Sequence, residues 1–376
     1  MTTPAEETIP PGAAPCRDLL RPEVLAAFDR DRFEREGCWV WDGVLTDEGR
    51  RRWTASLQRL QAMNDAVLTG TDWGAVDYAA RGLPAPPPET CTPEFLTSCR
   101  GGSEQMRVVQ LTPGLRDYMK DHGLFGPGTV PAVDGSRWEG VMPEYFPLAY
   151  DDFILDATTT HPQMMDLLGK LLGPRFLLDH ILMLNRPPGS TGRRWHAHGY
   201  RLGQHETEDV HGRDNDRPPT REYLPLQCVR TLCYPEGMGT DDGGGELAVV
   251  PGAHLYRSPY LWNTGRSEFD EQFQAGWMRG RFHAFTGEPL RIEVLSLNPG
   301  SMVSFVHHMP HRVGFRDADA PTRWGLLMAY RTPDPDEAEP AHWNEGVPAH
   351  WAERQEAAGR ITEPMRRVFE GDNPPA

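Results

Sequence analysis

The chain has 376 residues, 38% of them hydrophobic, and a formal net charge of −16. This apolar content is sufficient for a large buried core, and the sequence contains no run of about 18 apolar residues that would span a bilayer. The acidic charge argues against a nucleic-acid partner, because phosphate binding needs clustered Lys and Arg, and we expect it to favour solubility.

The cysteines and the first residues bear on the cellular compartment. The six cysteines form neither a CxxC pair nor a zinc-finger spacing. Residues 1–14 lack the basic and apolar regions of a secretory signal. We therefore expect a reduced, cytoplasmic protein without a membrane partner. The sequence does not indicate an oligomeric state.

The N-terminal part of the chain predicts a helical layer and a long insertion. We expect the proline-rich residues 1–16 to be a disordered lead-in. Apolar spacing then predicts two helices, at 22–33 and 50–63, with a strand at 38–41 between them. Residues 64–150 show little periodicity and many Pro and Gly residues, so we expect a surface elaboration there.

The C-terminal part of the chain predicts mainly strands. A helix is expected over 162–172, ending at Gly173. Seven apolar segments punctuated by Gly and Pro then predict strands, at 176–178, 181–184, 226–234, 245–250, 290–296, 302–306 and 324–331. Short strands after a helical layer are typical of a β-sandwich or barrel with helices packed outside.

The domain boundaries follow from this pattern. We expect one domain over 17–366 and a flexible tail over 367–376. The segments 201–221 and 256–285 are too long and polar for simple turns. Loops of this length usually act as lids or binding elements, and together with 64–150 they are predicted to enclose a substrate.

Three histidines are candidate metal ligands. Alternate residues of a strand point to the same face, so His196 and His198 would project together. His311 follows the predicted strand at 302–306, with His307 and His308 as alternatives. A jelly roll builds a three-residue metal site from two ligands on one strand and one on a remote strand. Imidazole suits Fe, Cu, Ni and Zn alike, and a His-x-His pair alone is weak evidence.

Several motifs, in the right order, give the chain a family resemblance. Over residues 28–331 it resembles the phytanoyl-CoA dioxygenase-like family of iron(II)/2-oxoglutarate oxygenases. The resemblance is carried by the entry segment (28–37 and 42–45), the segments before the first ligand (161–162, 171–174 and 185–189), Trp195-His196-Ala197-His198, the glycine-rich turn with its Pro-Gly-Ala-His (243–254), and the last-ligand segment (300–305) with His311 and Arg323.

The resemblance implies a fold, cofactors and site residues. It implies a double-stranded β-helix, the jelly-roll or cupin-like core, in a mainly β protein with flanking helices. His196 and His311 would be the first and last ligands of Fe(II). Arg323 would hold the distal carboxylate of 2-oxoglutarate, because a guanidinium binds a carboxylate through two parallel hydrogen bonds, and Arg186 would lie nearby. His254 belongs to a turn motif, and we expect it to be structural.

The implied activity is the oxidation of a small molecule. Such enzymes use molecular oxygen and convert 2-oxoglutarate to succinate. The basic residues are mostly arginine, and Ala, Gly and Pro are abundant, which is typical of a high-GC source. Family members from such sources often hydroxylate specialised metabolites, so a substrate of that class is expected by analogy.

His198 departs from the family pattern, which places Asp at this position. It would be a true third ligand, or it would swing away and leave a vacancy resembling that of iron halogenases. Alternatively the site is degraded, or a carboxylate from Glu206, Glu208 or Asp209 completes it. Two other functions stay open: a 2-oxoglutarate-independent three-histidine dioxygenase, and a binding protein without turnover.

Overall fold

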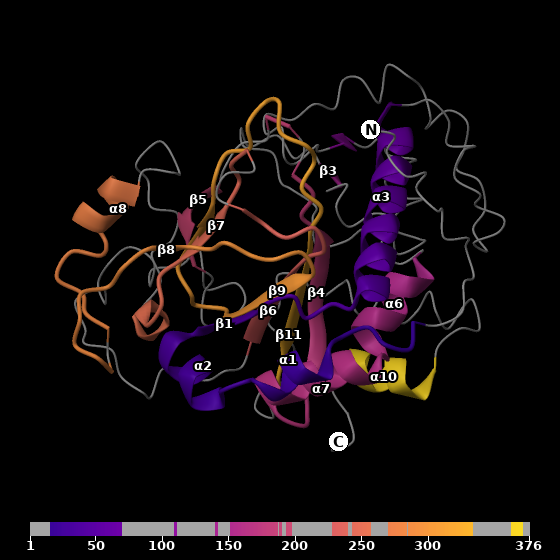
Figure 1. Ribbon diagram of the computed structural model, residues 1–376, viewed down its shortest axis with the longest axis horizontal. Helices are drawn as coiled ribbons and strands as arrows, with labels where there is room; N and C mark the ends of the chain where they lie inside the picture. Colours follow the sequence, from indigo (N-terminus) through magenta and orange to yellow (C-terminus); the bar gives the residue numbers. More distant parts are fainter. Residues whose placement is uncertain are drawn as a thin grey trace.

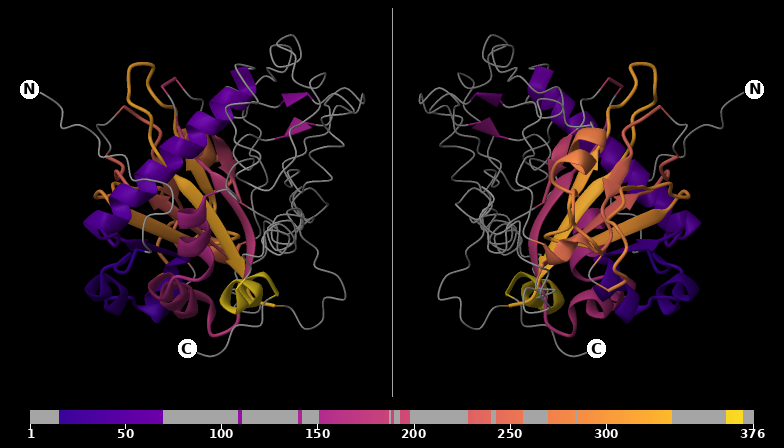
Figure 2. Two further views of the ribbon diagram at one scale, coloured as in Figure 1. Left: turned by 90° about the vertical axis from the view of Figure 1, so that its right-hand side faces the viewer. Right: turned by 90° about the vertical axis from the view of Figure 1, so that its left-hand side faces the viewer.

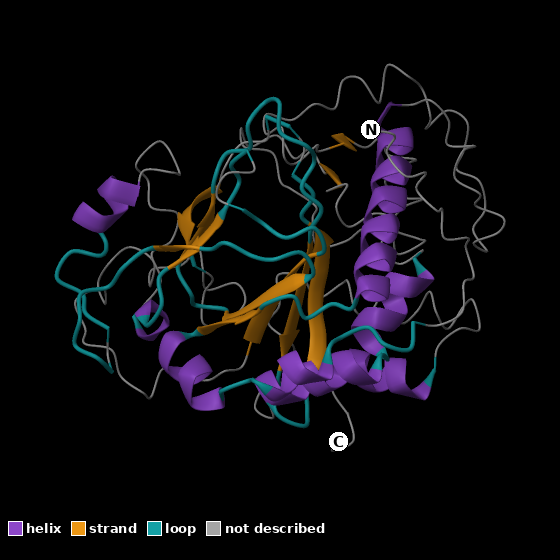
Figure 3. Ribbon diagram, viewed as in Figure 1, coloured by secondary structure: helices purple, strands orange, loops and turns teal. Residues whose placement is uncertain are grey.

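The strands of the protein form a two-sheet core with helices outside it (Figures 1 and 3). The structure is a computed structural model. It describes residues 16–69, 109–110, 140–141, 151–186, 188–189, 193–197, 228–239, 243–256, 270–283, 285–333 and 362–370. A separate short pair, β2 (Val109–Gln110) and β3 (Gly140–Val141), lies outside the core sheets.

The larger sheet has five antiparallel strands in the order β1-β9-β6-β11-β4. Their bounds are β1 (Cys38–Trp41), β9 (Ser301–Val306), β6 (Cys228–Tyr234), β11 (Leu326–Arg331) and β4 (Leu177–Met183). Every residue of β9 and β11 is buried. Such continuous burial means that both faces of the sheet are covered, which is why these strands read as unbroken apolar runs.

The smaller sheet has four antiparallel strands in the order β5-β10-β7-β8. Their bounds are β5 (Arg193–His196), β10 (His311–Val313), β7 (Leu247–Val249) and β8 (Glu293–Val294). The strands are short, and the pairing of β10 with β5 shifts register between His311 and Val313. This sheet is therefore held by few backbone hydrogen bonds.

The pairing of the strands is nested. Among the eight strands from β4 to β11, the first pairs with the last, the second with the second to last, and so on. The pairs are β4 with β11, β5 with β10, β6 with β9, and β7 with β8. A long hairpin rolled up so that successive pairs fall alternately in two sheets gives this order, which is the topology of a jelly roll. The predicted double-stranded β-helix is thus confirmed, with β1 added at one edge of the larger sheet.

The helices lie mainly on the far side of the larger sheet (Figures 1 and 2). This layer contains α3 (Asp47–Thr69), α6 (Asp152–Thr159), α7 (Pro162–Leu172) and α10 (Glu363–Glu370). α1 (Pro22–Ala26) and α2 (Arg30–Glu36) precede β1, while α8 (Asp270–Ala275) lies beyond the smaller sheet. None of the helices in the described part of the chain is long and apolar enough to cross a membrane.

Several predicted boundaries differ from the structure for local reasons. The helix expected over 22–33 is two helices, because the Asp29 carboxylate accepts a hydrogen bond from the Arg32 amide and begins α2. The helix expected over 50–63 runs from Asp47 to Thr69. The expected flexible tail over 367–376 begins inside α10, because Val368 and Phe369 are buried against the core.

The predicted insertions lie partly beyond what the structure describes. The lead-in up to residue 15 and the segment 201–221 lie outside the described residues, as does most of 64–150. The described part of 256–285 includes α8, whose Phe273 is fully buried, so that part packs as a layer on the smaller sheet.

Candidate metal centre and co-substrate site

Two of the expected metal ligands face each other in the smaller sheet. His196 is the last residue of β5 and His311 the first of β10, and the two are directly opposite in the antiparallel register. Residues opposite in a ladder project from the same face. Their imidazole centroids are 4.2 Å apart, with the ring planes inclined at 47°. The fold therefore brings two side chains 115 positions apart in the sequence to within reach of one ion.

The ring of His311 is held in a defined orientation. Its Nδ1 lies 2.8 Å from the carbonyl oxygen of Met309. A carbonyl oxygen only accepts hydrogen bonds, so Nδ1 donates, and in the neutral ring the lone pair is on Nε2. The ring is also packed against Phe305, with centroids 4.8 Å apart, and only 6% of His311 is exposed. A backbone carbonyl that fixes the tautomer in this way is typical of metal-binding histidines.

The third expected ligand, His198, lies outside the described residues. The structure describes the chain up to Ala197, which is buried. Among the described residues no group of three or more His, Cys, Asp or Glu side chains converges as a metal site. The described residues thus contain two expected ligands of the three.

The alternative ligands His307 and His308 lie elsewhere. The Nδ1 of His307 accepts a hydrogen bond from Arg230 Nε at 3.4 Å and is also 3.4 Å from the Cys228 sulfur, both at the start of β6 in the larger sheet. His308 is buried, and burial lowers its pKa to about 4, so its ring is neutral at neutral pH. Since His311 alone among these three pairs with His196, the strand register favours it over both alternatives.

The two arginines expected near the co-substrate form a backbone pair. Arg186 and Arg323 exchange both of their main-chain hydrogen bonds, at 2.7 and 2.9 Å, in an isolated antiparallel bridge. Both residues are buried, at 7% and 3% exposure. Because cross-strand partners project from the same face, the two guanidiniums lie on one side of this bridge. The sequence placed them 137 positions apart, and the fold makes them neighbours.

A glycine turn holds the guanidinium group of Arg323. Gly243, Gly244 and Gly245 all have φ between +77° and +89°, a region that favours glycine. The turn directs the Gly245 carbonyl at Arg323 Nη1, 2.6 Å away. A Cβ on Gly245 would lie 3.2 Å from the same nitrogen. The run of glycines thus allows the backbone to approach the buried cation closely.

Tyr234 is a further candidate for this site, and the sequence did not indicate it. It is the last residue of β6 and is 5% exposed. Burial raises its pKa to about 12, while the positive charges of Arg323 and Arg186 act in the opposite direction. The phenol is therefore within electrostatic range of both guanidiniums and stays protonated at neutral pH. Two cations and a hydroxyl donor are a suitable set for a carboxylate.

The arginine pair and the histidine pair are joined through β10. Arg186 Nη2 donates to the carbonyl of Gly314 at 2.8 Å, and Gly314 follows β10 directly. His311 begins the same strand, three residues earlier. At the rise of a strand this separation is about 10 Å. The two groups therefore lie toward opposite ends of one short strand.

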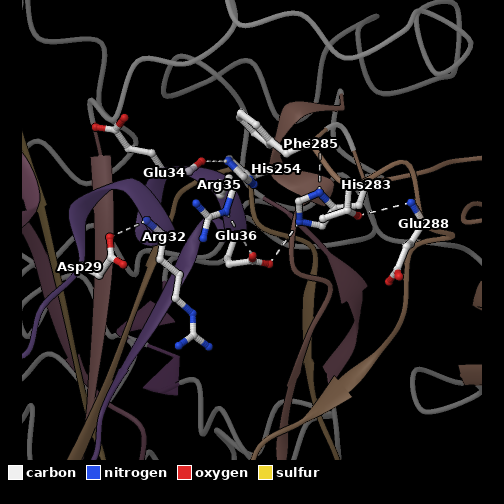
Figure 4. A network of polar contacts seen from close by, with 10 residues as sticks. Asp29, Arg32, Glu34, Arg35, Glu36, His254, His283, Phe285 and Glu288 are labelled. Carbon is white, nitrogen blue, oxygen red and sulfur yellow. Dashed lines mark hydrogen bonds and ion pairs between the residues drawn. The ribbon is translucent and has the colours of Figure 1, made fainter.

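His254 has the structural role that its turn motif predicts. It is 2% exposed, and its Nε2 lies 3.0 Å from the carbonyl of Glu34 at the end of α2 (Figure 4). Burial lowers its pKa to about 3, so the ring is neutral and Nε2 donates. The neighbouring His283 contacts Glu36 Oε2 at 3.2 Å and accepts from the Phe285 amide. These contacts tie α2 to His254 and His283.

Comparisons with known proteins extend only to fold. The sequence matches no protein-family model and no curated protein. One similar solved structure is the epimerase SnoN from nogalamycin biosynthesis, in complex with Fe3+, α-ketoglutarate and nogalamycin RO. Its sequence identity to this chain is 15% and the TM-score is 0.41, and the match covers 85% of this chain and 94% of SnoN. Another is EctD from S. alaskensis with 2-oxoglutarate and 5-hydroxyectoine, at 15% identity and a TM-score of 0.41. This match covers 90% of this chain and 84% of EctD.

A further similar structure is longer than this chain. EvdMO1 has 14% identity and a TM-score of 0.38, and the match covers 81% of this chain but only 49% of EvdMO1. The expected cofactors, iron and 2-oxoglutarate, are those present in the SnoN complex. At these levels of similarity the reaction of this chain must be inferred from its own residues.

Proposed function

We propose that the protein is a non-haem iron(II)/2-oxoglutarate-dependent oxygenase that oxidises a small molecule. One observation carries the proposal: His196 and His311 lie opposite each other with their rings 4.2 Å apart, and the Met309 carbonyl holds Nδ1 of His311 so that Nε2 carries the lone pair. Two neutral imidazoles on one face are a suitable donor set for ferrous iron. His198 is proposed as the third ligand.

The arginine pair supports 2-oxoglutarate as the co-substrate. Arg323 and Arg186 are buried cations at the far end of the strand that begins with His311. A dicarboxylate that reached iron with its keto-acid end would present its other carboxylate toward them. The protonated hydroxyl of Tyr234 would add a third donor there.

The chain would contribute binding, orientation and exclusion of water. Bound iron would supply oxygen activation, which no side chain provides. His196 and His311 would hold the ion between strands β5 and β10. Arg323 would orient the co-substrate through a planar, permanently charged group. Walls formed by buried residues such as Phe305 and Val249 would keep water from the reacting centre.

The experiment that tests this function is anaerobic loading of the protein with Fe(II), followed by addition of oxygen with and without 2-oxoglutarate. Succinate formation that requires both iron and 2-oxoglutarate is expected. Oxygen uptake without 2-oxoglutarate, in the presence of candidate substrates, would instead identify a three-histidine dioxygenase that cleaves its organic substrate. A folded protein that binds no iron and forms no succinate would contradict the proposal.

A further inference from the structure

The outer face of the smaller sheet carries a contact directly behind the histidine pair. Successive residues of a strand point to opposite faces. Trp195 precedes His196 on β5, and Arg312 follows His311 on β10. Both are buried, at 2% and 7% exposure. The Arg312 guanidinium carbon lies 5.6 Å from the centroid of the Trp195 ring. Each residue of the histidine pair therefore has an adjacent partner on the outside of the sheet.

One carboxylate binds both of these partners. Asp270, the first residue of α8, accepts a hydrogen bond from Trp195 Nε1 at 3.0 Å. It also accepts two from Arg312, from Nε and Nη2, each at 2.6 Å. The pairing with Arg312 is thus bidentate, the geometry in which charge-assisted hydrogen bonds are strongest. Asp270 bridges β5 to β10 from outside, at the level of the two histidines.

Aromatic packing fixes the β5 side of this bridge. The Trp195 ring stacks on Phe273 with centroids 4.4 Å apart and planes inclined at 2°. Phe273 stacks in turn on Trp277, at 5.3 Å and 9°. These rings belong to a second apolar cluster, separate from the main core, which joins α8 to the outside of the smaller sheet. Trp195 therefore has little freedom to move without α8.

The backbone between the two strands provides little restraint of its own. The β5–β10 ladder contains two paired positions, His311 with His196 and Val313 with Arg193, and its register shifts between them. An irregular two-position ladder is a weak way to fix the separation of two imidazoles. A metal centre, by contrast, requires its ligands to be held to within about half an ångström.

We propose that Asp270 is a positioning residue for the metal centre, setting the separation of His196 and His311 by bridging Trp195 and Arg312 behind them. The inference rests on the proposed function, because it assumes that the two histidines bind iron. Asp270 would touch neither the metal nor the substrate. The residue has no local sequence signal, since its partners lie 75 and 42 positions away.

The test uses Co(II) as a spectroscopic substitute for Fe(II) in the full-length protein. In Asp270→Asn the amide retains an acceptor for one partner, but its NH₂ group opposes Arg312. We expect Co(II) affinity to fall about tenfold, the lower end of the range for residues behind metal ligands. We also expect the Co(II) d–d absorption spectrum to change, because ligand separation is no longer unique.

Two control variants separate positioning from the packing of α8. Glu271→Gln changes an exposed carboxylate on the same helix, and Met278→Ala removes a buried side chain from the same apolar cluster. The first should resemble the wild type. The second should lower the unfolding temperature but leave the Co(II) spectrum unchanged. A spectrum altered equally by Met278→Ala would overturn the proposal, as would wild-type affinity and spectrum in Asp270→Asn.

A milder variant covers the case in which Asp270→Asn does not fold. Trp195→Phe keeps an aromatic ring on Phe273 but removes the Nε1 donor. We expect a smaller spectral change in the same direction, and an unchanged spectrum in this folded variant would count against the bridge. Wild-type protein that binds no Co(II) would show that the proposed function itself is wrong. Wild-type binding with unaffected variants would refute only the role of Asp270.

Discussion

The two sheets of the jelly roll differ in strand length, in burial and in the residues that they position. In the larger sheet β6, β9 and β11 have seven, six and six residues, nearly all buried. In the smaller sheet β5, β10, β7 and β8 have four, three, three and two. The larger sheet is covered on both faces and provides the core, whereas the smaller one carries the histidine pair. In the smaller sheet, the separation of the two histidines must therefore be fixed by side-chain contacts, including those of α8 behind the sheet.

The largest expected effect on stability comes from the larger sheet. Trp41 is fully buried, stacks on Phe28 at 5.0 Å and donates from Nε1 to Ser304 at 2.9 Å. Trp41→Ala should lower the unfolding free energy by about 3–5 kcal/mol, measured by denaturant titration. Phe282, which is 49% exposed, is the control, and Phe282→Ala should change stability by about 0.5 kcal/mol or less. A folded Trp41→Ala protein should still bind metal. Loss of metal binding in this variant would contradict the assignment of stability to the larger sheet and of metal binding to the smaller one.

A second prediction concerns the arginine pair. Arg323→Gln removes the fork that is proposed to bind the distal carboxylate, and should weaken 2-oxoglutarate binding about hundredfold, or about 2.7 kcal/mol. Isothermal titration of the iron-loaded protein measures this. Arg323→Lys keeps the charge without the bidentate geometry, so its affinity for 2-oxoglutarate should lie between those of the wild type and Arg323→Gln. Equal affinity in wild type and Arg323→Gln would contradict the proposal that Arg323 binds 2-oxoglutarate.

A third prediction concerns the joint between α2 and the 253–288 region. Gly37 has φ +75°, and a Cβ there would lie 2.3 Å from His254 Nδ1. Gly287 has φ +72° with nothing within 4 Å of its Cβ position. Both Ala variants incur backbone strain, but only Gly37→Ala adds a steric overlap. We expect Gly37→Ala to cost about 2 kcal/mol more than Gly287→Ala in thermal unfolding. Equal costs would show that His254 is not held tightly there.

The fourth prediction is a pH dependence, whose effect within any one pH unit is smaller than the preceding effects. Burial lowers the pKa of His254 to about 3, below the value of about 6.5 that it has in the unfolded chain. The unfolded state therefore takes up a proton first as the pH falls. The stability contributed by the neutral ring is complete above pH about 6.5 and is lost progressively toward pH about 3, at up to about 1.4 kcal/mol per pH unit.

The matched variant for this pH dependence is His254→Gln, whose amide can still donate to Glu34. Unfolding free energies of the two proteins between pH 7 and 4 should converge as the pH falls. Parallel curves would mean that His254 is not responsible.

Sequence patterns predicted the larger sheet better than the smaller one, for a physical reason. β9, β11 and α7 carry uninterrupted apolar or helical periodicity, and the structure places them close to the predicted bounds. β10, with three residues, is too short to carry a pattern of its own and lies outside the predicted strands. β8 has only two residues within the strand predicted over 290–296. α8 lies in a segment that reads as polar loop, and only its Phe273 is buried.

The candidate site was predictable where a residue type is itself informative. His196 and His311 could be singled out because imidazole is a metal ligand. His196 forms a His-x-His pair with His198, and His311 follows an apolar strand. Tyr234 and Asp270 could not, because their neighbours are distant in sequence and come together only through the sheet order. For His198, which lies outside the described residues, ligation stays a prediction.

The central claim is that His196 and His311 bind one iron ion. The most direct measurement is the iron content of protein loaded anaerobically with Fe(II) and freed of excess metal, for wild type, His196→Ala, His311→Ala and a control, His161→Gln. His161 contacts the Cys16 carbonyl at 2.8 Å and precedes α7 in the helical layer, not in the sheet that contains β10. We predict one iron per chain in the wild type and the control, and loss of iron in both other variants. Iron retained by His311→Ala, or absent from the wild type, would contradict the account.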